Sequence, residues 1–255
     1  SSTFLGHYAR CAHPYDFRSL RLVVAGAEKL APEVRQVYQE KFGMRVLEGY
    51  GVTETAPVLS VNTPVAAKTG SVGEPVPGVE CRLEPVAGIP GAGVLHVRGA
   101  NVMSGYLLED RPGEIQPPGS VFGPGWYNTG DVASLDGDGY LHILGRVRRF
   151  AKVAGEMVSL ELVERIAAEA SPDHQHGAVA VREQGRGETI LLLTEDPRLG
   201  RERLLDAARA LGAPELAIPR RIVHVEALPL LGSGKKDYVR LRQLAEQAAG
   251  RPEPP

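Results

Sequence analysis

The sequence predicts an α/β protein with two domains, and three changes of texture along the chain lead to this prediction. Near the start, an apolar strand at 20–24 precedes a helix at 32–42 and a second strand at 45–47. From 70 to 145, short β segments alternate with frequent glycine and proline. After Arg146 the pattern becomes helical again. A chain of 255 residues is long enough for one large domain or two smaller ones.

The first strand, helix and strand form a βα unit, which favours a mostly parallel sheet. Pro32 suits the first turn of the helix and Gly43 its end. Four side chains share one face of this helix: Val34, Val37, Tyr38 and Phe42. Ligands of such sheets bind beyond the carboxyl ends of the strands. Those ends are Ala25-Gly26-Ala27 and the run 48–54.

The middle part predicts a small barrel or a distorted sheet, because several short strands lie close together between turn signals. Residues 94–97 are expected to form one strand. Residues 132–135 are expected to pair with 140–144 across an Asp-Gly-Asp-Gly turn at 136–139. Asp136 and Asp138 resemble the start of a calcium loop, but the later acidic ligands are missing, so they are expected to form the turn.

The last part predicts a compact α+β module of about a hundred residues, an ordinary domain size. Ser159 is placed to cap a helix. The apolar face of that helix consists of Leu160, Val163, Ile166, Ala167 and Ala170. Strands are expected at 178–181, 190–193 and 222–225, with helices around 203–211 and from Asp237.

Composition excludes several classes of protein. A net charge of −2 gives no electrostatic footprint for nucleic acid. The apolar runs are too short for a membrane span. Cys11 and Cys81 stand alone, which indicates neither a disulfide framework nor a zinc site and favours a cytoplasmic protein. His174 and His176 are expected at the surface. Ser1 is neither a starting methionine nor part of a signal segment, so the chain is expected to begin inside a longer protein.

The run from Gly49 to Glu54 has the residue types of a nucleotide site. Glycines beside Tyr50 let the backbone approach a flat ligand while the ring offers a face for stacking. Thr53 supplies a hydroxyl for phosphate, and Glu54 supplies a hard oxygen ligand for Mg²⁺. A strand and turn with a core tyrosine explain the same residues equally well.

Asp131 and Arg146 flank the predicted hairpin. The Asp131 carboxylate is able to accept both hydroxyls of a ribose, as acidic residues do in dinucleotide folds. A turn-forming aspartate and a surface arginine are the ordinary alternatives, and for a single aspartate the ordinary one is commoner.

The segment 232–235, Gly-Ser-Gly-Lys, is not a P-loop. That motif requires glycine at position 229 and serine or threonine at position 236, where Pro229 and Lys236 stand. A glycine loop that presents Lys235 suits a mobile catalytic cation, although a solvated loop lysine is the commoner case.

The order of these motifs resembles the adenylate-forming superfamily of acyl-CoA synthetases, luciferases and peptide-synthetase adenylation domains. The resemblance covers essentially the whole chain after Leu20. It implies that residues 1–146 are the C-terminal part of the AMP-binding large domain, with βα units and a small β-barrel-like subdomain. Residues 147–255 are then a mobile α+β lid domain. The motifs that carry it are Tyr50–Glu54, 93–106, Tyr127–Asp131, Gly145-Arg146 with Lys152 and Gly155, and 232–235.

Three segments, 48–57, 149–161 and 229–237, resemble more closely the synthetase half of bifunctional bacterial 2-acylglycerophosphoethanolamine acyltransferase/acyl-[acyl-carrier-protein] synthetases. This resemblance implies that ATP activates a long-chain fatty acid to acyl-AMP. The acyl group then passes to the phosphopantetheine thiol of acyl carrier protein and on to a lysophospholipid. The implied location is the cytoplasm, at the inner face of a bacterial inner membrane through a preceding N-terminal part. An acyl-CoA synthetase and a non-catalytic nucleotide-binding or carrier-binding remnant are the alternatives.

The resemblance also implies a role for each site residue, with ATP or AMP and Mg²⁺ as ligands. Arg148 occupies the hinge position, where the family usually has Asp or Lys. The family's phosphate loop should lie upstream, and nothing of that type occurs in this chain, which favours the remnant for the chain alone. The implied roles are adenine binding by Ala25, Gly26, Ala27, Tyr50 and Gly51; phosphate binding by Thr53; magnesium binding by Glu54; ribose binding by Asp131 and Arg146; charge stabilisation by Lys235; and thioester formation with Lys152 and Gly155.

Overall fold

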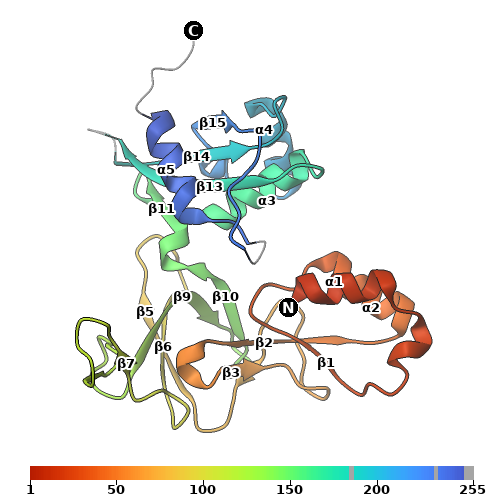
Figure 1. Ribbon diagram of the computed structural model, residues 1–255, viewed down its shortest axis with the longest axis vertical. Helices are drawn as coiled ribbons and strands as arrows, with labels where there is room; N and C mark the ends of the chain where they lie inside the picture. Colours follow the sequence, from red (N-terminus) through yellow and green to blue (C-terminus); the bar gives the residue numbers. More distant parts are fainter. Residues whose placement is uncertain (184–186, 233–234, 250–255) are drawn as a thin grey trace. The chain divides into compact units, whose positions relative to one another are not determined.

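The computed structural model describes residues 1–183, 187–232 and 235–249. The chain divides into two compact units: residues 1–86 with 91–144, and residues 87–90 with those from 145 onward. Both units combine helices with sheets (Figure 1), so the predicted α/β class is confirmed.

The first sheet of the first unit has the order β1-β2-β3-β4. Only β1 and β2 run parallel, and β3 and β4 add on as antiparallel strands. The expected mostly parallel sheet is therefore limited to the one βα unit. Pro32 begins α2, and Gly43 ends it with φ 64°. The elements are α1 Ser2–Cys11, β1 Val23–Ala25, α2 Pro32–Phe42, β2 Val46–Gly51, β3 Val58–Val61 and β4 Glu74–Pro75, with single-turn 3-10 helices at Pro14–Phe17 and Thr53–Thr55.

Helices α1 and α2 lie together against the strands β1 and β2 in Figure 1. Tyr38 of α2 is 1% exposed and packs with Val23, Ala25 and Val46 from the two strands. Alternate residues of β1 point the other way, since successive side chains of a strand lie on opposite faces. This cluster packs α2 against β1 and β2 and so fixes where the carboxyl ends of the two strands lie.

A second sheet follows, with the order β10-β9-β6-β5. It is open, with β10 and β5 at its edges, so the distorted sheet is present and a closed barrel is not. Asp136 forms the turn as expected, because its Oδ1 accepts from the amides of Asp138 and Tyr140, both at 3.0 Å. The strands are β5 Glu80–Pro85, β6 Gly93–Arg98, β9 Tyr127–Leu135 and β10 Leu141–Arg146; β7 Tyr106–Leu107 and β8 Ile115–Gln116 form a separate ribbon.

The second unit is built on the sheet β13-β14-β15, in which β14 pairs antiparallel with β13 and parallel with β15. A hairpin of β11 and β12 precedes it, and the sequence pattern did not predict this hairpin. Ser159 caps α3 as expected, since its Oγ accepts from the Leu162 amide at 3.4 Å. The elements are β11 Phe150–Val153, β12 Glu156–Ser159, α3 Leu160–Ala170, β13 His176–Glu183, β14 Gly187–Thr194, α4 Arg201–Ala210, β15 Arg221–His224 and α5 Tyr238–Ala249, with 3-10 turns at Val147–Arg149 and Glu215–Ala217.

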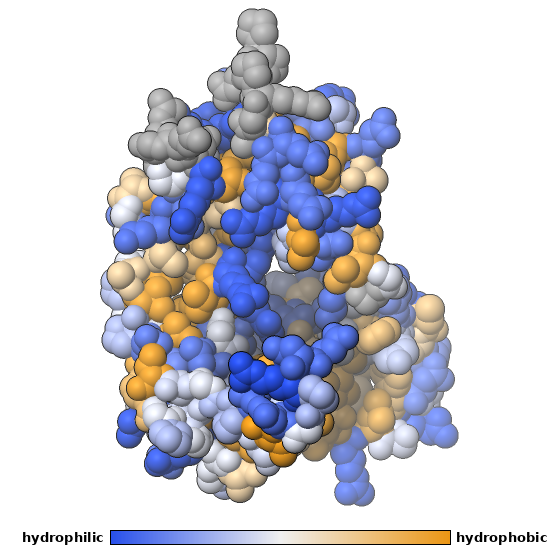
Figure 2. All heavy atoms as spheres, turned by 60° about the vertical axis from the view of Figure 1, so that its left-hand side comes forward, coloured by the Kyte–Doolittle hydropathy of each residue, from blue (hydrophilic) through white to orange (hydrophobic). Residues whose placement is uncertain are grey.

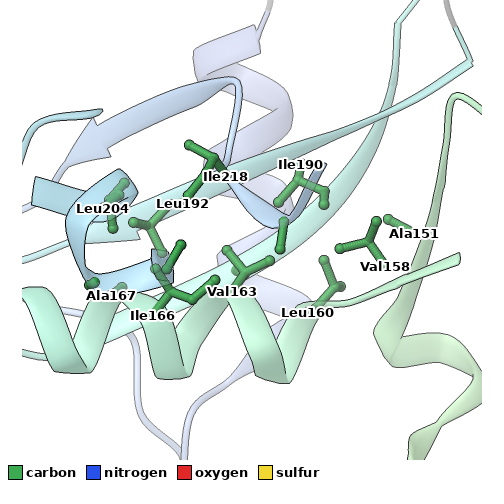
Figure 3. Close-up of a cluster of buried hydrophobic side chains, with 14 of the residues drawn as sticks. Ala151, Val158, Leu160, Val163, Ile166, Ala167, Ile190, Leu192, Leu204 and Ile218 are labelled. Carbon is green, nitrogen blue, oxygen red and sulfur yellow. The ribbon is translucent and has the colours of Figure 1, made fainter. Parts of the chain in front are cut away.

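Both faces of this sheet are covered. Ile190 and Leu192 of β14 point toward the apolar face of α3 (Figure 3), whereas Leu191 and Leu193 pack with Leu241 of α5. Strand alternation thus supplies two cores from one strand. The residues of α3 in this contact are Leu160, Val163, Ile166 and Ala167, as the helical periodicity predicts.

The surface is mixed. Figure 2 shows hydrophobic residues interspersed among hydrophilic ones over the face that it draws. None of the helices in the described part of the chain is long and apolar enough to cross a membrane.

Candidate functional site

The carboxyl ends of β1 and β2 lie side by side. Ala25 pairs with Glu48 in the parallel register. A Cβ added at Gly26 would lie 3.3 Å from the carbonyl oxygen of Gly49, so the two backbones leave little room between them. Ala27 has φ 68°, in the left-handed region that non-glycine residues rarely adopt, which identifies a constrained turn. The structure therefore brings the two predicted ligand-facing ends together.

Tyr50 and Asp131 are joined directly. The Tyr50 hydroxyl donates to Oδ2 of Asp131 at 2.5 Å, across 81 positions of sequence. Asp131 is 4% exposed, and Tyr50 is half-buried and packs against a core cluster that includes Leu59 and Leu141. Tyr50 is thus both a core residue and a partner of the candidate ribose-binding carboxylate. Its position is therefore compatible with both interpretations, a core tyrosine and a residue of a nucleotide site.

Asp131 lies inside strand β9, not at its edge as the sequence pattern suggested. The strand starts five residues earlier than predicted, at Tyr127, and its backbone is irregular just before Asp131. Gly130 has φ 71°, and its amide donates to Oδ1 of Asn128 at 2.8 Å. The Thr129 hydroxyl donates to the Leu95 carbonyl at 2.8 Å and accepts from the Asp131 amide at 3.1 Å. These contacts set the position of the carboxylate.

Gly51 ends β2, and Thr53 begins the 3-10 turn that follows it. A Cβ at Gly51 would lie 1.9 Å from the Pro57 carbonyl oxygen, so a side chain has no space there. Thr55 is fully buried, and its hydroxyl bridges the carbonyls of Val52 and Pro57 at 3.0 and 2.8 Å. This turn leaves Thr53 exposed to solvent.

Glu54 is held by residues to which the sequence analysis gave no role. The Tyr106 hydroxyl donates to Oε1 of Glu54 at 2.9 Å, and the Met103 amide donates to the Glu54 carbonyl at 2.8 Å. Burial, followed by a hydrogen bond with Tyr106, raises the pKa of the Tyr127 hydroxyl, which therefore stays a donor. The sequence offered a signal for Tyr106 and Tyr127, because both lie in motifs that carry the resemblance, 93–106 and Tyr127–Asp131.

Arg146 is exposed at the end of β10, the neighbour of β9 in the sheet. It belongs to the second unit, as does Arg148 in the 3-10 turn that follows. Arg148 is exposed as well.

Lys152 and Gly155 lie on the hairpin of β11 and β12. Val153 pairs with Glu156, so Ala154 and Gly155 form a two-residue connection, with φ of 50° and 91°. Positive φ at both positions is typical of a type I′ turn. Gly155 is therefore explained by the backbone, and a Cβ there would meet nothing within 4 Å. Lys152 is exposed on β11, and its amide donates to Glu188 at 2.6 Å.

Lys235 is exposed on the segment that joins β15 to α5. Its carbonyl accepts from the Leu231 amide at 2.7 Å, and Leu230 forms an antiparallel bridge with Lys236. Residues 233 and 234 of the predicted glycine loop lie outside the described residues. The structure thus presents Lys152 on the β11–β12 hairpin and Lys235 on a separate segment of the second unit.

Two further observations bear on the predictions. A cavity of about 390 Å³ in the first unit is lined in part by Arg35, Glu48 and Lys68, and it contains none of the predicted nucleotide-binding residues. The expectation of a surface position for His176 is wrong: it is 3% exposed, with its ring nitrogens 2.9 Å from the Thr194 hydroxyl and 2.8 Å from the Ser171 carbonyl.

Comparisons with known proteins identify the family. Residues 3–107 match the family described as AMP-binding enzyme. A long-chain-fatty-acid–CoA ligase of Salmonella typhimurium is 33% identical over 245 residues, which cover 92% of this chain and 42% of the relative. A feruloyl-CoA synthase of an Amycolatopsis species is 31% identical over 258 residues, covering 92% of this chain and 50% of the relative.

A solved structure gives the same result for the fold. The anthranilate CoA ligase AuaEII in complex with anthranoyl-AMP aligns with a TM-score of 0.71 at 25% identity, covering 98% of this chain and 49% of that one. The chain spans about half the length of the curated relatives it matches. The family match, these relatives and the shared fold show that the chain belongs to the AMP-binding enzymes of the adenylate-forming superfamily.

Proposed function

We propose that the chain carries part of the machinery of an ATP-dependent acid–thiol ligase. Residues 1–146 would be the C-terminal part of the AMP-binding large domain, and residues 147–255 its mobile lid. The observation that carries the proposal is the Tyr50–Asp131 hydrogen bond. It joins the residue proposed for adenine to the residue proposed for ribose, on a chain whose family is described as AMP-binding.

In the first reaction, a fatty acid carboxylate would attack the α-phosphorus of ATP, forming acyl-AMP and releasing pyrophosphate. Ala25, Gly26, Ala27 and Gly51 would frame the adenine beside Tyr50, with Asp131 and Arg146 on the ribose. Thr53 would contact the phosphates. Lys235 would stabilise negative charge that builds on the reacting oxygens, where a preorganised cation is most effective.

Glu54 would bind Mg²⁺. Magnesium in nucleotide sites usually takes one or two carboxylates plus substrate phosphates, so one suitably held carboxylate fits this requirement. Among the described residues there is no cluster of three or more His, Cys, Asp or Glu side chains able to hold a metal without a nucleotide. Magnesium would supply positive charge for the phosphate oxygens, while Tyr106 would keep Glu54 in place.

In the second reaction, a thiol would attack the acyl carbonyl and AMP would leave, giving a thioester. Lys152 and Gly155 are proposed for this step. Their position on a hairpin turn separate from the Lys235 segment supports different roles for the two loops. Arg148, exposed in the turn before this hairpin, is proposed as the hinge.

The acyl acceptor would be a phosphopantetheine thiol, carried either by acyl carrier protein or by CoA. The three segments that resemble acyl-[acyl-carrier-protein] synthetases support the carrier protein. In that case the acyl group would go on to a lysophospholipid, in the cytoplasm at the inner face of the bacterial inner membrane. The relatives, a long-chain-fatty-acid–CoA ligase and a feruloyl-CoA synthase, support CoA.

The test uses the product of the complete coding sequence, with palmitate as the acid. Palmitate-dependent exchange of labelled pyrophosphate into ATP is expected, followed by thioester formation when a thiol is added. Holo-acyl carrier protein and CoA, supplied separately, decide the acceptor. If none of the acids palmitate, octanoate and ferulate supports pyrophosphate exchange while AMP still binds, the protein is a non-catalytic remnant.

A further inference from the structure

Glu164 of α3 is the meeting point of three segments of the second unit. Its Oε1 accepts from Arg149 at 2.7 Å and from the Ala178 amide at 2.9 Å. Its Oε2 accepts from Lys236 at 2.9 Å and from the Tyr238 hydroxyl at 3.1 Å. Both carboxylate oxygens are therefore fully used by protein groups, and the cluster is not a ligand site.

These contacts are largely shielded from water. The side chains of Glu164 and Arg149 are each 12% exposed, and that of Lys236 is 25% exposed. Arg149 also stacks on the Tyr238 ring at 3.9 Å. A surface ion pair contributes little, but loss of one partner from a buried group leaves an uncompensated charge and is costly. Glu164 consequently holds its partners firmly.

Two of those partners flank the base of the segment that carries Lys235. Lys236 forms the bridge with Leu230, and the Asp237 amide donates to the Pro229 carbonyl at 2.9 Å. Tyr238 begins α5 one residue later. Glu164 therefore fixes the side of this base that leads into the helix.

The pairing also distinguishes two adjacent lysines. Lys236 turns inward to Glu164, whereas Lys235, in the bend just before it, is exposed. A slip of one residue would exchange the two lysines, as a register slip exchanges the faces of a strand.

We propose that Glu164 is a positioning residue for acyl-adenylate formation: by holding Lys236 inward, it fixes the register that presents Lys235 to the reacting phosphate and carboxylate. This inference rests on the proposed function. It assigns Glu164 and Lys236 to the first reaction through Lys235, and it gives them no part in thioester formation.

The test compares variants of the complete gene product in two assays: palmitate-dependent pyrophosphate exchange, and thioester formation from preformed palmitoyl-AMP. Lys236→Met removes the inward lysine and leaves Glu164 paired with Arg149, whereas Lys236→Arg keeps the ion pair. Glu164→Gln removes the charge. Asp196→Asn is the matched control, because Asp196 is another buried carboxylate of this unit, 4% exposed and paired with Arg203 at 2.9 Å.

Lys236→Met and Glu164→Gln are expected to lower kcat of exchange at least about tenfold, since a displacement of about 1 Å can cost about a hundredfold. The KM for ATP should change by less than about twofold and the thioester rate by less than about threefold, because the lost interaction acts in the first transition state. Lys236→Arg should restore exchange. Asp196→Asn should not separate the two assays.

Wild-type exchange by Lys236→Met would overturn the inference, as would a parallel fall in both assays for Lys236→Met and Asp196→Asn. Lys236→Met decides the matter if Glu164→Gln does not fold. Failure of the proposed function gives a different result: the wild type shows no acid-dependent exchange, or Lys235→Ala exchanges at the wild-type rate.

Discussion

The two units use their sheets differently. In the second unit, β14 buries every residue from Ile190 to Leu193, because helices cover both faces. In the first unit, β1 buries Val23 and Ala25 but leaves Val24 53% exposed, and Leu22 just before it is 56% exposed. The second unit therefore buries its central strand on both faces, whereas the first unit covers only one face of β1.

This difference extends to the candidate sites. In the first unit the backbone positions the site: strand register aligns Gly26 with Gly49, and Gly51 lies too close to Pro57 for a side chain. In the second unit a side-chain network around Glu164 holds the segment next to Lys235. Substitutions should consequently act through burial and charge pairs in the second unit and through local geometry in the first.

The largest expected effect contrasts the two sheets directly. Leu192→Ala should cost about 2–5 kcal/mol of unfolding free energy, because it opens a cavity in a fully buried core. Val24→Ala should change stability by less than about 0.5 kcal/mol, since the side chain already faces solvent. Urea unfolding followed by NMR amide signals of β14 and β1 measures both. Equal losses would mean that β1 is covered as completely as β14.

The second prediction concerns Asp131 in the first unit. Asp131→Ala in the complete gene product should weaken ATP binding by about 1.5–3 kcal/mol, the range for hydrogen bonds to a charged group. Titration calorimetry with ATP provides the measurement. Asp138→Ala is the matched control, because its carboxylate is 74% exposed in the turn. Unchanged ATP affinity for Asp131→Ala would refute the ribose assignment.

A smaller effect is expected for Tyr50→Phe, which keeps the ring and removes the hydroxyl that donates to Asp131. The expected loss of ATP affinity is about 1 kcal/mol, a typical net value for one hydrogen bond. Combining it with Asp131→Ala should add little further loss, because both changes remove the same bond. Full additivity would show that the two residues act independently and that backbone geometry alone sets the site.

The sequence pattern predicted elements with strong local signals and missed those that depend on distant contacts. Helix α3 was predicted because an N-cap serine and helical periodicity coincide between Ser159 and Ala170. The hairpin of β11 and β12 was missed because its turn is Ala-Gly with both residues at positive φ, an unusual choice for the first position.

The candidate sites show the same division. The order of the motifs identified Tyr50 and Asp131 separately as candidate site residues. Their hydrogen bond was not predicted, because it joins residues 81 positions apart and no local sequence pattern encodes it. Asp131 was expected at a hairpin edge because the predicted strand began at Val132, whereas β9 begins at Tyr127 and continues through a register shift opposite Leu95, where the Thr129 hydroxyl donates to the Leu95 carbonyl. Glu164 was not singled out, since a glutamate on an amphipathic helix ordinarily faces solvent.

The smallest expected effect is a pH dependence of the second unit. Burial lowers the pKa of His176 below its ordinary value of 6.5, and the nearby positive charge of Lys236 acts in the same direction. As the pH falls below 6.5, His176 binds a proton in the unfolded chain but stays neutral in the folded chain. The contribution of His176 is therefore fully present above pH 6.5 and is lost as the pH falls toward the lower folded pKa.

Urea unfolding of the wild type, followed by the NMR amide signals of β14, should show a midpoint that declines between about pH 7.5 and pH 5, the range in which histidine titrates. His176→Gln should be less stable at the upper end, because it disturbs the contacts with Thr194 and Ser171, but its midpoint should fall less steeply. The two proteins differ only at position 176, so the difference between their slopes reports on His176. Equal slopes of midpoint against pH for the two proteins would show that His176 binds its proton as readily in the folded state as in the unfolded state. The burial of this sheet would then not extend to His176 at the start of β13.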